Sequence, residues 1–323
     1  AGVTWTSALN VGIVSHLLYS VGSSPAGISA VIGGFQDNGT RIRSGGTTTF
    51  NQTIGGDGFG TDLHQTNASL MLGSLYNTDI RKSTNGGASF ASACTGITEC
   101  GNQNSAPFFS KLVRWEGDAA SNTVYTITNT KVYKSTNYAG SWTALGTSGL
   151  PATSLFFRNL NVAKTNSNIV GVVANSGRVF LSTNGGATWA APAGTLPGNG
   201  ASFSYIHFDT TNPATIYVSS VAPSSTAGHL WKTTNSGATW SRLDTNPGFP
   251  VGVPVNFVKN DPGLATTLYA GTHLGVYVST DGGANWTRFG TGLPLVSVTD
   301  LYVSPDSTLV RAATFGRGFW QLN

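Results

Sequence analysis

A short segment that recurs five times at nearly constant spacing constrains the fold of this chain more than any other feature. Each copy has Ser or Thr first, Asn or Asp third and an aromatic residue eighth, and the copies begin at Ser83, Ser135, Ser182, Thr233 and Ser279. Successive copies begin 46 to 52 residues apart. A repeat of this length indicates one supersecondary unit per copy, with the units stacked or closed into an array.

Each copy predicts a β-hairpin turn followed by a buried aromatic anchor. The copies follow alternating apolar runs, and their polar side chains can bond nearby backbone while Gly accepts a positive φ. The eighth residue can fold back between neighbouring sheets and bury a large ring. These aromatic residues are Phe90, Trp142, Trp189, Trp240 and Trp286.

The segments resemble the Asp-box, or bacterial neuraminidase repeat, of sialidases, xyloglucanase-type glycosidases and sortilin-like receptors, all of which are β-propellers. The matches cover nearly the whole chain. The resemblance implies that each box joins the third and fourth strands of a blade, on the face opposite the binding sites. Because enzymes and receptors share this fold, the resemblance leaves the function open.

We predict an all-β fold in which residues 1–323 form a single β-propeller domain of seven four-stranded blades. The four-strand pattern is regular at 155–193 and fits, at about these ranges, 12–57, 58–104, 105–150, 201–245 and 253–292. The stretch from Val298 to Leu322 has three strands, and the N-terminal segment from Gly2 to Thr6 is expected to supply the fourth. Such closure removes exposed sheet edges.

Composition agrees with a large all-β core and narrows the classes of partner. The chain has 323 residues, 42 of them Gly, and only 9% are charged. Its 17 basic residues are scattered without a long run, which disfavours a nucleic-acid partner. No apolar run reaches the roughly 18 residues of a membrane span. A start at Ala1 without Met is typical of a processed product.

The two cysteines, Cys94 and Cys100, predict a disulfide. They lie close together, and neither a His nor a second Cys pair is near enough in sequence to complete a zinc site. Because such bonds persist mainly outside the cytoplasm, the pair favours a secreted or extracytoplasmic location.

Candidate ligand-binding residues come from two sets of loops that a four-stranded blade places on one face, above the central channel. One set enters each inner strand, and the other joins the second strand to the third. The candidates in or beside these loops are Asn38, Asp79, Arg158, Arg178, Tyr205, His229, Asn256, His273, Asp300 and Arg317.

Asp37 and Asp57 are the candidate catalytic pair, since both lie in Gly-rich segments where the backbone can approach a ligand closely. Two carboxylates at a channel mouth can serve as acid and base in glycoside hydrolysis. In the xyloglucanase-type enzymes that the chain resembles, one catalytic Asp lies in a comparable loop of the first blade, and this position corresponds to Asp37.

Other interpretations of the pair stay open. Asp in a Gly-rich turn often bonds its own backbone, and Asp57 can tie adjacent blades together. The pair can also bind a ligand without catalysis. A Ca²⁺ site formed with Asn38 is a further alternative because hard cations take oxygen ligands; no other cofactor or metal is expected.

Sialidase activity is disfavoured by the residue inventory. The only Glu residues are Glu99 and Glu116, and the segment Arg41 to Arg43 lacks the Pro of the sialidase Arg-Ile-Pro motif. Three arginines that can still converge on an anion are Arg158, Arg178 and Arg317.

Two hypotheses for the function follow. The first is a secreted carbohydrate-active enzyme that resembles a glycoside hydrolase and cleaves a polysaccharide with Asp37 and Asp57. The alternative is a non-catalytic propeller that binds a glycan or a protein, or forms part of an extracellular assembly.

Overall fold

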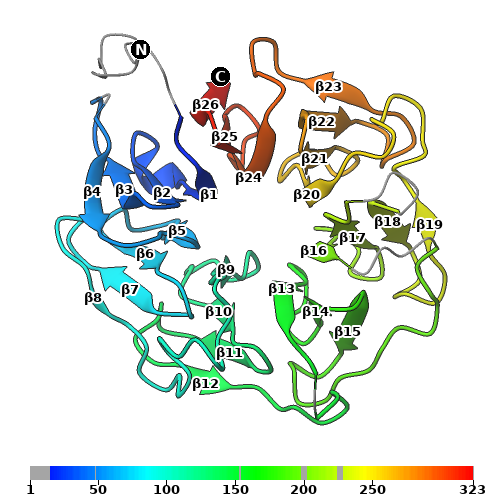
Figure 1. The fold of residues 1–323 in the computed structure, drawn as a ribbon, viewed down its shortest axis with the longest axis horizontal. Helices are drawn as coiled ribbons and strands as arrows, with labels where there is room; N and C mark the ends of the chain where they lie inside the picture. The colour runs from blue at the N-terminus through cyan, green and yellow to red at the C-terminus, as the bar shows by residue number, and fades with distance from the viewer. Residues whose placement is uncertain (1–14, 48, 153, 198–201, 224–227, 323) are drawn as a thin grey trace, which may run out of the picture.

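The computed structural model describes residues 15–47, 49–152, 154–197, 202–223 and 228–322. Seven antiparallel sheets surround a central channel in chain order (Figure 1). Within the described residues, five sheets have four strands and two have three. The predicted seven-bladed propeller is therefore confirmed.

The strands of the first four blades follow the order of the chain. One 3-10 turn, η2 (Pro25–Gly27), lies between the first and second strands of the first blade. These strands are β1 (Leu18–Gly22), β2 (Val31–Phe35), β3 (Gly39–Arg43), β4 (Asn51–Ile54), β5 (Thr61–Leu63), β6 (Met71–Ser74), β7 (Ile80–Ser83), β8 (Ala91–Ser92), β9 (Val113–Arg114), β10 (Val124–Ile127), β11 (Val132–Ser135), β12 (Thr143–Ala144), β13 (Phe157–Val162), β14 (Val170–Ala174) and β15 (Arg178–Ser182).

The last three blades repeat this order. Their strands are β16 (Phe203–Phe208), β17 (Ile216–Ser220), β18 (Leu230–Thr233), β19 (Ser241–Arg242), β20 (Val255–Asn260), β21 (Leu268–Thr272), β22 (Gly275–Ser279), β23 (Thr287–Phe289), β24 (Ser297–Val303), β25 (Val310–Phe315) and β26 (Gly318–Leu322).

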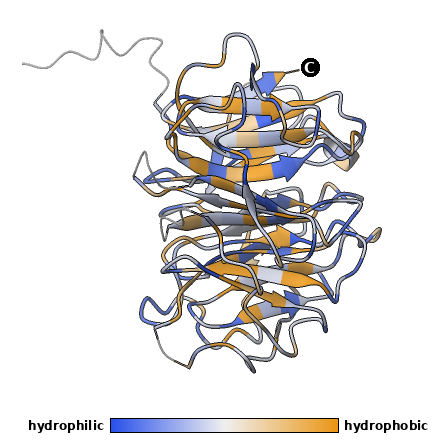
Figure 2. Ribbon diagram, turned by 90° about the vertical axis from the view of Figure 1, so that its right-hand side faces the viewer, coloured by the Kyte–Doolittle hydropathy of each residue, from blue (hydrophilic) through white to orange (hydrophobic). Residues whose placement is uncertain are grey.

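The hydrophobic core lies between the blades rather than inside any one of them. One cluster joins Tyr125 and Val132 of the third blade to Leu160 and Val172 of the fourth. In the side view, many segments of the strands are apolar (Figure 2). Each sheet therefore buries its faces against its neighbours.

The recurring segments form a closed turn between the third and fourth strand positions of a blade. In the fourth blade, the Ser182 hydroxyl donates to Asn184 Oδ1 at 2.9 Å and accepts the Gly186 N–H at 2.8 Å. Thr188 N–H donates to the same Asn184 oxygen. The other four copies make equivalent bonds. The turn is thus held by its own side chains.

The aromatic residue that ends each turn packs between neighbouring blades, and in three of the turns it also forms a hydrogen bond to the preceding blade. Trp189 is only 4% exposed. Its main-chain N–H donates to Ser148 O at 2.9 Å and its indole N–H to Gly146 O at 2.8 Å. Trp142 and Trp286 also donate their main-chain N–H groups to the preceding blade. The predicted packing of these rings between blades is confirmed.

A glycine in the preceding blade makes this contact possible. Gly149 follows Ser148 and has φ +86°, and a Cβ added there would lie 1.9 Å from Trp189 O. Gly96 and Gly248 stand in the same relation to Trp142 and Trp286, at 2.1 and 1.8 Å. No side chain fits at these three positions.

The first and seventh blades meet along the channel. Thr299 donates to Leu18 O at 2.7 Å, and Leu17 forms a bridge with Phe315. The closing strand predicted from Gly2 to Thr6 lies outside the described residues.

We expect Gly149→Ala to destabilise the fold more than Gly292→Ala does. Both glycines have nearly the same φ, +86° and +88°, but nothing lies within 4 Å of a Cβ at Gly292. Gly292→Ala should cost about 1 kcal/mol for the left-handed backbone. Gly149→Ala should cost about 3 kcal/mol, because overpacking against Trp189 O is added. Urea unfolding of both variants measures the difference, and equal losses would contradict the proposed role of the contact.

Candidate functional site

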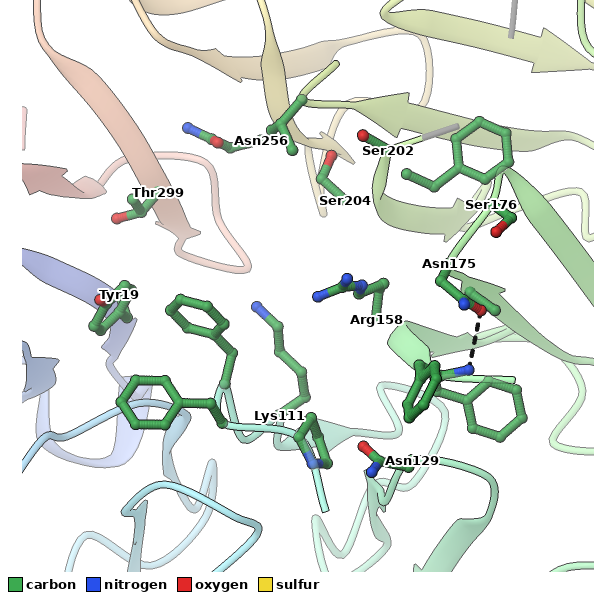
Figure 3. Close-up of a pocket in the computed structure, with 18 residues that line it drawn as sticks. Tyr19, Lys111, Asn129, Arg158, Asn175, Ser176, Ser202, Ser204, Asn256 and Thr299 are labelled. Carbon is green, nitrogen blue, oxygen red and sulfur yellow. Dashed lines mark hydrogen bonds between the residues drawn. The ribbon is translucent and has the colours of Figure 1, made fainter. Parts of the chain in front are cut away.

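A cavity of about 640 Å³ opens at the mouth of the channel (Figure 3). Its lining includes loops that precede inner strands or join second strands to third strands, so it lies on the face opposite the recurring turns. Inner strands and loops from several blades contribute to its wall, which we call the mouth pocket. Three of its residues are unusually exposed phenylalanines: Phe108 at 51%, Phe109 at 44% and Phe156 at 46%. Large apolar side chains left exposed around a cavity are typical of a binding site.

Contacts between aromatic rings hold the side chains on one side of this pocket in place. The Tyr19 ring on β1 lies 4.8 Å from Phe59 and 5.2 Å from Phe109, and Phe108 stacks on Tyr76 at 6.0 Å. Burial, together with the nearby Asp57 and Asp37 carboxylates, raises the pKa of Tyr19 to about 12. Its hydroxyl therefore stays protonated at neutral pH and donates to Gln36 Oε1 at 2.8 Å.

The predicted disulfide between Cys94 and Cys100 is present in the structure. It closes the loop that precedes Phe108. Within that loop the Glu99 carboxylate accepts the Tyr133 hydroxyl and pairs with Lys131 at 2.7 Å. Burial alone would raise the pKa of Glu99, but hydrogen bonds from Lys131 and Tyr133 lower it below its usual value. Phe108 and Phe109 thus follow a segment that is held by the disulfide and by the contacts of Glu99.

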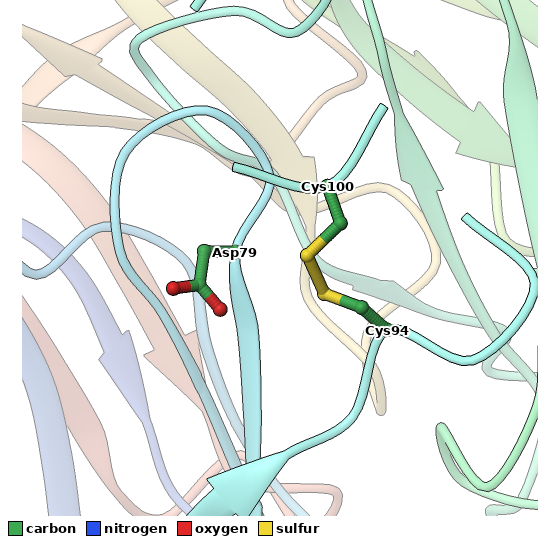
Figure 4. A group of neighbouring side chains, drawn as sticks. All are labelled: Asp79, Cys94 and Cys100. Atoms are coloured by element: carbon green, nitrogen blue, oxygen red, sulfur yellow. A yellow bond between two sulfur atoms is a disulfide. The ribbon is translucent and has the colours of Figure 1, made fainter. Parts of the chain in front are cut away.

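Asp79 lies beside the disulfide, with one atom each from Asp79, Cys94 and Cys100 within 4.8 Å of one another (Figure 4). The two sulfurs are bonded to each other, so they supply no thiolate for a metal ion. The Asp79 carboxylate instead pairs with Arg81 at 2.6 Å. These three residues therefore stabilise the loop rather than bind a metal ion.

Two cationic side chains extend into the mouth pocket, Lys111 before β9 and Arg158 on β13 (Figure 3). Among the described residues, neither side chain has a hydrogen-bonding or ion-pair partner. Burial in the channel lowers the pKa of Lys111; Asp300 opposes this shift and Lys259 adds to it.

A narrower cavity of about 120 Å³ continues below the mouth pocket and contains a satisfied ion pair. Lys259 donates to Asp300 Oδ1 at 2.7 Å, and Val21 N–H donates to the other Asp300 oxygen at 3.1 Å. Burial alone would lower the pKa of Lys259, but Asp300 raises it. Burial also raises the pKa of Tyr205, which lines the same cavity. Asp300 thus connects the sixth, seventh and first blades.

The structure brings Asp37 and Asp57 together. The Asp37 N–H, in a turn residue with φ +58°, donates to Asp57 Oδ1 at 2.6 Å. Neither residue lines the mouth pocket or the narrower cavity. Asn38 in the same turn donates its side-chain amide to Gln36 O at 3.1 Å. The catalytic role of the pair, and the calcium site, stay predictions.

Other sequence candidates are dispersed. Of the three arginines considered for anion binding, only Arg158 lines the mouth pocket. The Arg178 guanidinium bonds Asn175 O and Asn175 Oδ1 in its own turn. Arg317 is exposed and donates to Gly316 O. The three side chains therefore do not form one cluster in this pocket.

The two histidines also differ in position. His229 is fully buried, its main-chain N–H bonding Asp244 and its Nε2 lying 2.9 Å from Ala222 O. His273 is exposed in the β21–β22 turn, and partial burial lowers its pKa. Asn256 lines both cavities and donates its amide to Val298 O at 2.8 Å.

Sequence reasoning missed Phe108, Phe109, Lys111 and Phe156. One signal was available: Pro107 is followed by two adjacent aromatic residues in a segment without apolar alternation. Adjacent large apolar residues outside a strand or helix have no sheet face to fill, which favours a surface role.

Comparisons with known proteins agree with the fold. A family model described as the DUF6242 beta propeller domain matches residues 108–294, more than half of the chain. No curated protein matches the sequence. Across the described residues, no helix has the length and apolar character required to cross a membrane.

The similar solved structures include enzymes and a peptide-bound protein. A GH74 enzyme from Niastella koreensis matches with a TM-score of 0.63 at 20% identity, over 96% of this chain and 43% of that one. The GH74 xyloglucanase from Xanthomonas campestris matches with a TM-score of 0.72 at 16% identity, over 96% and 52%. This chain therefore spans about half the length of these enzymes.

YCF48 from Cyanidioschyzon merolae matches along nearly its whole length. The TM-score is 0.68 at 14% identity, over 95% of both chains. A structure of YCF48 bound to D1 peptide also matches, with a TM-score of 0.62 at 14% identity, over 95% of this chain and 91% of that one. At these identities, the likeness shows the fold alone.

We expect the double variant Cys94→Ala with Cys100→Ala to lose about 2 kcal/mol of unfolding free energy, the amount expected from the chain entropy of a short loop. Thermal unfolding with and without reductant measures this loss. Reductant should lower the melting temperature of the parent and leave the double variant unchanged. A parent that keeps its melting temperature once both thiols are free would contradict a stabilising role.

Proposed function

We propose that this chain, which belongs to the DUF6242 beta propeller domain family, binds a segment of a glycan chain in its mouth pocket without catalysing a reaction. One observation carries the proposal. The described part of the pocket wall exposes phenylalanine rings and contains no Asp or Glu.

Pocket size and chemistry both support a glycan segment. Its volume of about 640 Å³ falls within the range usual for sites that bury a compact ligand. The exposed rings of Phe108 and Phe156 can cover the apolar face of a sugar. Asn129 and Ser176, also in the wall, provide polar groups for its hydroxyls.

Glycoside hydrolysis by Asp37 and Asp57 is the alternative function, supported by their proximity and by the likeness to GH74 enzymes. Hydrolysis requires the scissile bond to lie between two carboxyl groups. Here one oxygen of Asp57 already accepts the Asp37 N–H, and the pair lies outside both cavities. These contacts favour a structural role for Asp57.

A protein partner is a further possibility for the same face. The likeness to YCF48 bound to D1 peptide supports it at the level of the fold. We favour a glycan because the exposed rings surround a pocket rather than a flat patch. The disulfide supports a secreted or extracytoplasmic location. The five closed turns support kinship with Asp-box propellers.

Phe108→Ala combined with Phe156→Ala should weaken glycan binding about tenfold or more, as expected when buried aromatic anchors are truncated. Affinity electrophoresis against a panel of plant and microbial polysaccharides identifies a bound glycan, and titration calorimetry measures the loss. Leu295→Ala is the matched control because Leu295 is 65% exposed and outside the mouth pocket. Thermal unfolding checks that each variant is folded.

The same panel separates binding from hydrolysis. We expect the parent protein to release no reducing ends from a polysaccharide that it binds. Release that Asp37→Asn and Asp57→Asn each abolish would establish the enzymatic alternative. An unchanged affinity in the Phe108 and Phe156 double variant would refute the proposed site.

A further inference from the structure

We infer that the glycan held in the mouth pocket carries carboxylate groups, and that Lys111 and Arg158 bind one of them. This inference rests on the proposed function and specifies its ligand as an acidic polysaccharide. The two residues come from the third and fourth blades, and both side chains extend into the same opening (Figure 3).

The protein has already engaged many of the other polar groups in this wall. Asn175 Nδ2 donates to Ser154 O, and its Oδ1 accepts the Phe156 N–H. Ser204 donates to Val255 O at 2.7 Å. By contrast, no described residue accepts a hydrogen bond from the side chain of Lys111 or of Arg158. An incoming ligand therefore meets two charged donors that have no protein acceptor.

The carboxylate that acts on Lys111 is already engaged by other groups. Asp300 acts on Lys111 through its field, which opposes the lowering of the Lys111 pKa, but its oxygens accept bonds from Lys259 and Val21. Lys111 is partly buried, and a buried cation without a hydrogen-bonded partner is unfavourable, so a carboxylate from the ligand would relieve that cost.

The chemistry of the two side chains suits a single carboxylate. The planar Arg158 guanidinium can donate two parallel hydrogen bonds, whereas the Lys111 ammonium contributes a compact charge. Two cations within an aromatic pocket match a sugar acid, in which a carboxylate is attached to a ring with an apolar face. A chain of dense phosphates would require a longer basic track, and the basic residues here are scattered.

Polygalacturonate and its fully methyl-esterified form test the inference, because they share a backbone and differ in the carboxylate charge. The parent should bind the acid form about tenfold more tightly than the ester, the factor expected for one charge-assisted hydrogen bond. Lys111→Met and Arg158→Gln should each reduce this preference, and Lys111→Arg should retain it. Added salt should weaken binding of the acid form more than binding of the ester.

Lys164→Met is the matched control, since Lys164 follows β13 at the opposite end of that strand and is outside the mouth pocket. Equal affinity for acid and ester, unchanged in the Lys111 and Arg158 variants, would overturn the inference while leaving glycan binding intact. Binding of polyglutamate as tightly as polygalacturonate would also overturn it. Failure to bind any polysaccharide would refute the proposed function itself.

Discussion

The contact of the aromatic residue of each recurring turn with the preceding blade, which in three turns includes a main-chain hydrogen bond, is the interaction on which the ring depends. It joins Trp189 to Ser148, and equivalent bonds start at Trp142 and Trp286. No sheet buries its faces alone, so the hydrophobic core forms only where neighbouring blades pack together. The contact that holds one blade against the next therefore also assembles the core. Gly149 shows how close this approach is, since a single Cβ would collide with a carbonyl oxygen.

This assembly places binding groups that are distant in sequence around one opening. Tyr19 belongs to the first blade, Arg158 to the fourth and Asn256 to the sixth, yet all three line the mouth pocket. Their side chains project from inner strands whose positions the ring determines. A site built on such strands is more rigid than one formed by loops alone. The turns on the opposite face therefore support the pocket without contacting it.

The fold was predictable because its signals are local. Ser182, Asn184 and Gly186 close a turn within five residues, and the spacing of such turns gives the blades. The disulfide was predictable for the same reason. The pocket depends on packing between blades, which no local pattern encodes. His229 was expected at the mouth, but its side chain is fully buried, with Nε2 2.9 Å from Ala222 O.

Electrostatics separates the two candidate functions of the channel mouth. Burial and then the negative fields of Asp57 and Asp37 raise the pKa of Tyr19, whereas the mouth pocket contains Lys111 and Arg158 without a carboxylate in its described wall. An acidic glycan would be drawn to the cations and repelled by the Asp pair. The charges that favour such a ligand therefore oppose its approach to the carboxylate pair proposed for catalysis.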